Sequence, residues 1–265
     1  MHVHMVRTLC CVMCLGMASL SSAAADEVAV KGRQILDAHK GAVVTILLVL
    51  KRKVSFPGRP SRDSESKVEA TGTVISPDGL TVVSLALTDP ASLMEMMSES
   101  TPRAGEFKME TELRDAKILL EDGTEVPAEI ILRDRELDMA FVRPLEKYDT
   151  PFAYIDISDP GAPDYLDQVI SINRMGKVAG RVYSVSVERI DAIVRKPRTF
   201  YIPGKDTTNT GLGSPAFTLD GDFIGVFLIR AIKRTGGGSG DNIMTVILPA
   251  IDIADAAEQA PPFKE

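Results

Sequence analysis

A few side chains of this sequence could take part in acyl transfer, in which a hydroxyl oxygen attacks a carbonyl carbon. That chemistry needs a serine oxygen, a histidine that removes its proton, and a carboxylate that orients the histidine. Ser214 lies in the glycine-rich stretch TGLGSP, and Asp138 lies in ELDMAFV. His39 is the only histidine after the first 25 residues, and Lys205 is an alternative base. The spacing of these residues does not by itself indicate a catalytic set.

Metal, nucleotide and nucleic-acid chemistry have no matching pattern in the sequence. No His, Cys, Asp and Glu residues have metal-ligand spacing, so we expect neither a metal nor another cofactor. The glycine run at residues 235–241 (TGGGSGD) lacks the Lys-Ser/Thr ending of a phosphate-binding loop and is expected to be a flexible loop. The formal net charge of -7 argues against a general nucleic-acid-binding surface.

The elements that must position these residues are mostly short strands joined by turns. Short apolar, β-branched runs separated by Gly, Pro and Asp are typical of strands, and Asp122-Gly123 and Asp220-Gly221 indicate hairpins. Strands are predicted at residues 42–50, 69–75, 80–85, 116–120, 125–132, 139–142, 168–173, 181–187, 198–202, 216–219, 223–229 and 242–248. Helices are predicted at residues 27–39, 90–97 and 251–257, and exposed loops at residues 51–67 and 98–112.

The first 25 residues have the pattern of a signal peptide. Arg7 precedes a short apolar segment, Leu9–Leu20, and Ser22-Ala23-Ala24-Ala25 offers a cleavage site. The apolar segment is shorter than the roughly 20 residues that span a bilayer, although an N-terminal membrane anchor is the alternative. No later stretch is long enough to span a membrane. We therefore expect an exported protein, periplasmic or secreted, and one without disulfides, because all three cysteines precede residue 25.

Four segments, in chain order, resemble the HtrA-like family of trypsin-fold serine proteases. Residues 72–89 (GTVISPDGLTVVSLALTD) resemble the family hairpin GxxISPDGxxxTNxHV, which ends in the catalytic histidine, and Ala86 occupies the histidine position. Residues 122–142 (DGTEVPAEIILRDRELDMAFV) resemble the segment that carries the triad carboxylate, which Asp138 retains. Residues 210–226 (TGLGSPAFTLDGDFIGV) resemble GNSGGPLxNxxGxVIGV and place Leu212 at the nucleophile position. Residues 236–251 resemble the loop and strand before the closing helix.

The resemblance implies an all-β fold, a trypsin-like double β-barrel with a short C-terminal helix. It divides the chain into a signal peptide at residues 1–25, an N-terminal lead-in at 26–41, a protease-fold domain at 42–259 and a tail at 260–265. No peptide-binding PDZ module is expected after the domain, because the sequence ends at Glu265. Family members often form trimers, so a homo-oligomer is an open alternative.

The departures from the family pattern predict a pseudoprotease. Ala86 cannot accept a proton and Leu212 cannot attack a carbonyl, and in a comparable triad enzyme the loss of either group costs about 10⁶ in turnover. The predicted function is non-catalytic binding of a polypeptide or protein partner, as a scaffold or a regulator. A further hypothesis is a purely structural envelope or surface protein whose cleft has no function.

An alternative hypothesis is a serine endopeptidase with a nonstandard site. Ser214 would be its nucleophile, but it lies two positions beyond Leu212, and Pro215 disfavours the shifted turn that this role needs. The turn Gly211-Leu212-Gly213 either presents N–H groups as an oxyanion hole does, or is an ordinary connection between strands. Asp138 is either a remnant of the triad or a carboxylate that accepts backbone hydrogen bonds or pairs with an arginine.

Overall fold

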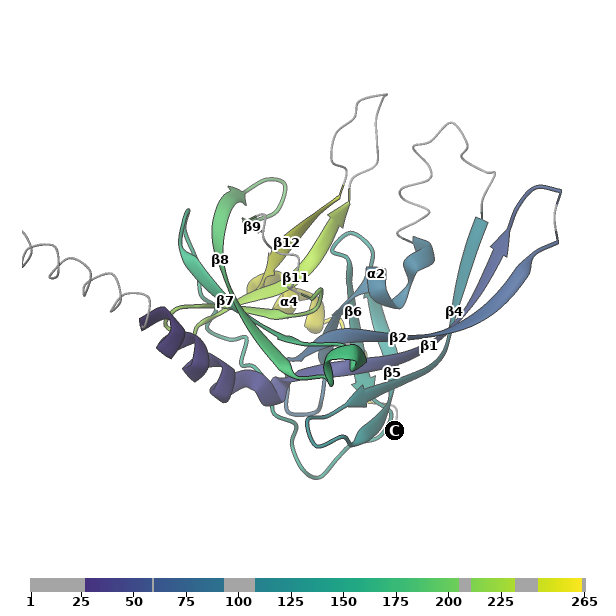
Figure 1. The fold of residues 1–265 in the computed structure, drawn as a ribbon, viewed down its shortest axis with the longest axis horizontal. Helices are drawn as coiled ribbons and strands as arrows, with labels where there is room; N and C mark the ends of the chain where they lie inside the picture. Colours follow the sequence, from purple (N-terminus) through teal and green to yellow (C-terminus); the bar gives the residue numbers. More distant parts are fainter. Residues whose placement is uncertain (1–26, 59, 93–107, 205–210, 232–242, 264–265) are drawn as a thin grey trace, which may run out of the picture.

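The strands of the protein close into two six-stranded antiparallel barrels in the computed structural model (Figure 1). The structure describes residues 27–58, 60–92, 108–204, 211–231 and 243–263. The strand order is β1-β2-β3-β6-β5-β4 in the N-terminal barrel and β10-β11-β12-β9-β8-β7 in the C-terminal barrel. This architecture confirms the predicted all-β double barrel. The predicted signal peptide and the loop at residues 235–241 lie outside the described residues.

Most strands begin within a few residues of their predicted positions. The N-terminal barrel contains β1 (Val43–Ser55), β2 (Arg62–Val74), β3 (Thr81–Ser84), β4 (Lys108–Leu119), β5 (Glu125–Asp134) and β6 (Met139–Pro144). The C-terminal barrel contains β7 (Gln168–Arg174), β8 (Tyr183–Val194), β9 (Phe200–Pro203), β10 (Pro215–Thr218), β11 (Phe223–Ala231) and β12 (Ile243–Pro249). Helical segments are residues 27–39, η1 (Lys40–Ala42), α2 (Leu85–Thr88), η2 (Lys177–Ala179) and α4 (Ala250–Ala257). A further helix begins at residue 90, and the rest of its predicted range, 93–97, is outside the described residues.

The predicted loop at residues 51–67 is shorter in the structure, only the described residues between 56 and 61 lying outside strands, and the predicted loop at 98–112 is wrong for residues 108–112. β1 runs on to Ser55, β2 begins at Arg62 and β4 begins at Lys108, so these three strands extend together beyond the barrel (Figure 1). Their polar composition suggested a loop, but opposite charges fall on neighbouring strands, as in the Lys51–Asp63 ion pair at 2.8 Å. One face of this ribbon is exposed and the other is only half-buried, so polar side chains can lie on both faces.

The helix at residues 27–39 packs against the C-terminal barrel. Ile35 is buried in the core, and the His39 ring stacks on the Phe217 ring with centroids 4.6 Å apart. Lys31 forms an ion pair with Asp220 at 2.9 Å, in the β10–β11 hairpin turn. The predicted lead-in is therefore an ordered part of the barrel packing.

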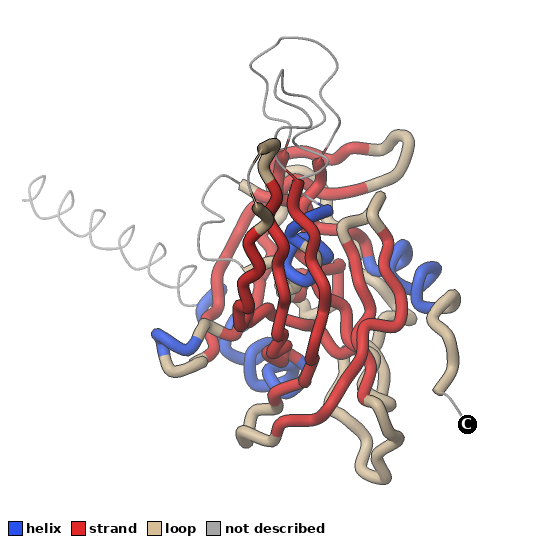
Figure 2. The backbone as a smooth tube through the Cα atoms, turned by 90° about the vertical axis from the view of Figure 1, so that its right-hand side faces the viewer, coloured by secondary structure: helices blue, strands red, loops and turns tan. Residues whose placement is uncertain are grey.

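The C-terminal helix α4 packs against β11 and β12, and its Ile253 is fully buried in the larger hydrophobic core. Figure 2 shows this helix outside the strands and leading into the C-terminal tail. The tail then reaches the N-terminal barrel, where Arg143 donates a hydrogen bond to the Pro261 carbonyl. None of the described helices is long and apolar enough to cross a membrane.

Candidate functional site

Asp138 and Ala86, two of the three positions that align with the catalytic triad, are in direct contact. Asp138 precedes β6 and has a φ of 55°, in the left-handed region that aspartate tolerates better than most residues. Its Oδ1 accepts the Ala86 N–H at 2.7 Å. Its Oδ2 accepts the Ser84 hydroxyl at 2.7 Å and the Ile229 N–H at 2.9 Å. Ile229 is on β11, so this carboxylate joins the two barrels.

Burial dominates the electrostatics of Asp138. Desolvation raises its pKa from 3.8 to about 6, against the hydrogen bonds from Ile229, Ser84 and Ala86, which lower it. Among the described residues Asp138 forms no ion pair, so it is held by hydrogen bonds and not by an arginine. With alanine at position 86, the carboxylate orients no imidazole.

We expect the shifted Asp138 pKa to make stability depend on pH. The Asp138 carboxyl binds its proton more tightly in the folded state than in the unfolded chain. The protonated carboxyl therefore stabilises the fold fully below pH 3.8, and this stabilisation is lost as the pH rises through about 6. Relative to Asp138→Asn, which does not titrate, the wild type should lose on the order of 2 kcal/mol of unfolding free energy between pH 4 and pH 7. Urea unfolding of both proteins across this range measures the effect. A difference between the two proteins that stays constant with pH would refute the shifted pKa.

The turn at residues 211–214 lies between the barrels and is fixed by both. The Gly213 N–H donates to the Phe227 carbonyl of β11 at 2.7 Å, and the Gly213 carbonyl accepts the Thr73 hydroxyl of β2 at 2.7 Å. The Ser214 N–H donates to the Gly211 carbonyl at 3.1 Å. The N–H groups of Gly213 and Ser214 are thus bound within the protein and do not face a substrate oxyanion.

Ser214 is enclosed and does not have the environment of a nucleophile. It is fully buried, and its hydroxyl donates to Asn173 Oδ1 at 3.3 Å. The same amide oxygen accepts the Thr71 hydroxyl at 2.7 Å. Among the described residues no hydrogen bond joins His39 to Ser214; His39 instead stacks on Phe217, and burial lowers its pKa. Lys205, the alternative base, lies outside the described residues.

A cavity of about 270 Å³ opens beside the nucleophile position. Its apolar wall includes Leu87 and Leu212, and Leu212 is the one of the three aligned positions that lines it. Its polar wall comes from β1, β2 and the end of β7 and includes Thr45, Glu69, Thr71, Asn173 and Arg174. The structure therefore has a hollow beside Leu212, lined by residues of both barrels.

The polar residues of this cavity could not be found from the sequence. Arg174 donates to the Leu119 carbonyl at 2.7 Å and to the Leu120 carbonyl at 2.9 Å, and Glu69 is held by Arg181. None of them belongs to a recognisable motif, and they meet only because the two barrels pack together. The described residues contain no group of three or more His, Cys, Asp or Glu side chains that could hold a metal ion.

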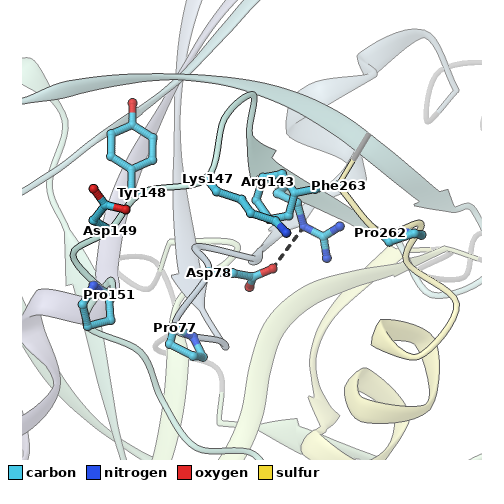
Figure 3. Close-up of a pocket in the computed structure, with 9 residues that line it drawn as sticks. All are labelled: Pro77, Asp78, Arg143, Lys147, Tyr148, Asp149, Pro151, Pro262 and Phe263. Atoms are coloured by element: carbon cyan, nitrogen blue, oxygen red, sulfur yellow. Dashed lines mark ion pairs between the residues drawn. The ribbon is translucent and has the colours of Figure 1, made fainter. Parts of the chain in front are cut away.

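A second cavity, of about 620 Å³, lies at the C-terminal tail (Figure 3), and none of the three aligned positions lines it. Arg143 and Lys147 both face the Phe263 ring there, at 5.0 and 5.5 Å from its centroid. Arg143 also pairs with Asp78 at 3.5 Å. The cationic side chains of this cavity, Arg143 and Lys147, thus already have partners in the protein.

Two comparisons bear on the origin of this arrangement. A family model described as a trypsin-like peptidase domain matches residues 70–226, more than half of the 265-residue chain. The matched segment includes all three triad positions, Ala86, Asp138 and Leu212. A search of curated proteins finds no match.

Proposed function

The chain belongs to the trypsin-like peptidase domain family, and on that premise we propose that it is a pseudoprotease, which binds polypeptide between its barrels without cleaving it. Alanine and leucine at the histidine and serine positions support the loss of acyl transfer, because neither side chain can take a proton or attack a carbonyl. Ser214 lies two residues after Leu212 and carries a hydroxyl, but this hydroxyl is buried and hydrogen-bonded, which also supports the loss of acyl transfer.

The cavity beside Leu212 is the strongest support for binding. A protein that used this fold only as a scaffold could close the space beside Leu212 with larger side chains. Here about 270 Å³ stays open, with both apolar and polar walls. Such a pocket suits one side chain of a bound peptide.

An unpaired strand edge next to the cavity supports a polypeptide ligand in particular. β3 pairs with β2 only at Thr73 and Val74, so among the described strands the earlier part of β2 is paired on one side alone, with β1. Glu69 and Ala70 of this part line the cavity, whereas the Thr71 carbonyl already lies against Gly213, so a peptide could pair only with the part of β2 before Thr71. An extended peptide can add to such an edge through main-chain hydrogen bonds while a side chain enters the pocket.

The proposal is tested by the binding of fluorescently labelled, unfolded casein and of its peptides to the purified protein. Wild type should bind them and leave them intact. Leu212→Trp fills the cavity mouth with a larger side chain and should weaken binding by about tenfold or more. Val178→Trp is the matched control, because Val178 is fully exposed on η2 and does not line the cavity. Equal binding by wild type and Leu212→Trp would count against this site.

We further propose that the protein works outside the cytoplasm, in the periplasm or in the medium. The basic residue, short apolar segment and alanine-rich site of residues 1–25 support export. Cell fractionation and N-terminal sequencing of the exported protein test it, and recovery of the full-length chain in the cytoplasm would contradict it.

A further inference from the structure

Arg174 is a buried cation without a carboxylate partner among the described residues. It is 8% exposed, and its two Nη atoms donate to the backbone carbonyls of Leu119 and Leu120. Its guanidinium also lies 5.7 Å from the Tyr183 ring centroid. In the described part of the chain it forms no ion pair, and its Nε has no hydrogen-bond partner. A buried charge of this kind is costly unless an anion pairs with it.

Arg143, the other buried arginine in the described part of the chain, shows how such a charge is paired elsewhere in the protein. Arg143 is also 8% exposed, but its guanidinium pairs with Asp78 at 3.5 Å (Figure 3). The missing counter-charge therefore distinguishes Arg174 from a buried arginine that serves structure alone.

The surroundings of Arg174 are those of an anion site. Arg174 lines the cavity beside Leu212, and so does Thr45, which is 3% exposed and whose Oγ1 has no hydrogen-bond partner among the described residues. The one acidic residue of the wall, Glu69, is already compensated, because Arg181 and the Lys177 N–H bind its carboxylate. The charge of Arg174 is thus the one left without compensation at this cavity.

We propose that this cavity takes a carboxylate of the bound polypeptide, a conclusion that rests on the proposed function. The carboxylate would enter towards Arg174 Nε and Thr45 Oγ1, two buried atoms without a hydrogen-bond partner among the described residues, so side chains of the wall must move to expose these donors. Charge-assisted hydrogen bonds of this kind are among the stronger ones. The methylene groups behind the carboxylate would lie against Leu87 and Leu212. The carboxylate belongs to an Asp or Glu side chain or to the C-terminus of the ligand.

Matched peptides separate these two sources and test the proposal. The probes are the casein peptides that bind wild type, each made with its acidic residues kept or replaced by Gln and Asn, and with a free or an amidated C-terminus. Loss of affinity by about tenfold or more on neutralising the side chains or the C-terminus is expected and identifies the source. If all four forms bind within twofold of one another, the carboxylate site is wrong while polypeptide binding stands. If no casein peptide binds at all, the proposed function itself fails.

Variants assign the preference to Arg174. Arg174→Gln should reduce the preference for the carboxylate form to less than twofold, and Arg174→Lys should keep part of it. Arg174→Gln also removes the hydrogen bonds to the Leu119 and Leu120 carbonyls and can disturb folding. Thr45→Val is therefore measured as well, because valine has nearly the shape of threonine. It should reduce the preference for the carboxylate form about threefold. Arg143→Gln, which removes a buried arginine elsewhere, should leave the preference intact. An unchanged preference in folded Arg174→Gln, or in Thr45→Val if Arg174→Gln does not fold, overturns the proposal.

Discussion

Gly213→Ala is expected to lower the free energy of unfolding by about 4 kcal/mol or more, because it forces a side chain into backbone at the contact between the barrels. A Cβ atom at this position would lie 2.0 Å from the Thr71 carbonyl oxygen, far inside van der Waals contact, and the neighbour is backbone that cannot rotate away. The φ of 91° adds strain for any L-residue. Since Gly213 bonds to β11 through its N–H and to Thr73 of β2 through its carbonyl, relief of the clash would disturb the contact between the barrels.

Gly123→Ala is the matched control for this prediction. Gly123 has nearly the same φ, 89°, but nothing lies within 4 Å of the position of its Cβ. Its substitution should therefore cost only the backbone strain, about 1–2 kcal/mol. Urea unfolding of the three proteins gives both numbers. A Gly213→Ala variant as stable as Gly123→Ala would show that the turn at 211–214 does not hold the barrels together as described.

The sequence was sufficient to predict the hairpins near the triad positions, because their turns are encoded locally. Asp122-Gly123 and Asp220-Gly221 form turns where they were expected, with positive φ at both glycines. Closure of the strands into two barrels followed from the family resemblance; strand periodicity alone did not distinguish a sandwich from a pair of barrels.

Neither the long polar strands nor the cavity could be predicted from the sequence, for two different physical reasons. β1, β2 and β4 lengthen into polar segments because each strand pairs with a neighbour, and pairing is not visible in composition. The cavity brings Thr45 of β1 together with Arg174 of β7, from opposite barrels. Only the packing of the barrels places both residues at one cavity. The Ile229 N–H bond to Asp138 also depends on this packing.

The double variant Ala86→His/Leu212→Ser is expected to gain proteolytic activity that wild type lacks. Asp138 already accepts the N–H of residue 86 at 2.7 Å, so an imidazole at that position would have a carboxylate beside it. Each reacting group contributes about 10⁶ in turnover in a comparable triad enzyme, and the two act as a unit. Each single variant should therefore stay as inactive as wild type.

Hydrolysis of unfolded casein by wild type, with Ser214→Ala and the double variant measured beside it, tests the central claim most directly. Wild type and Ser214→Ala should both remain at the uncatalysed background and take up no serine-directed fluorophosphonate at residue 214, because Ser214 is fully buried. The double variant should cleave. Cleavage by wild type that Ser214→Ala abolishes would contradict the account and establish an endopeptidase that uses Ser214.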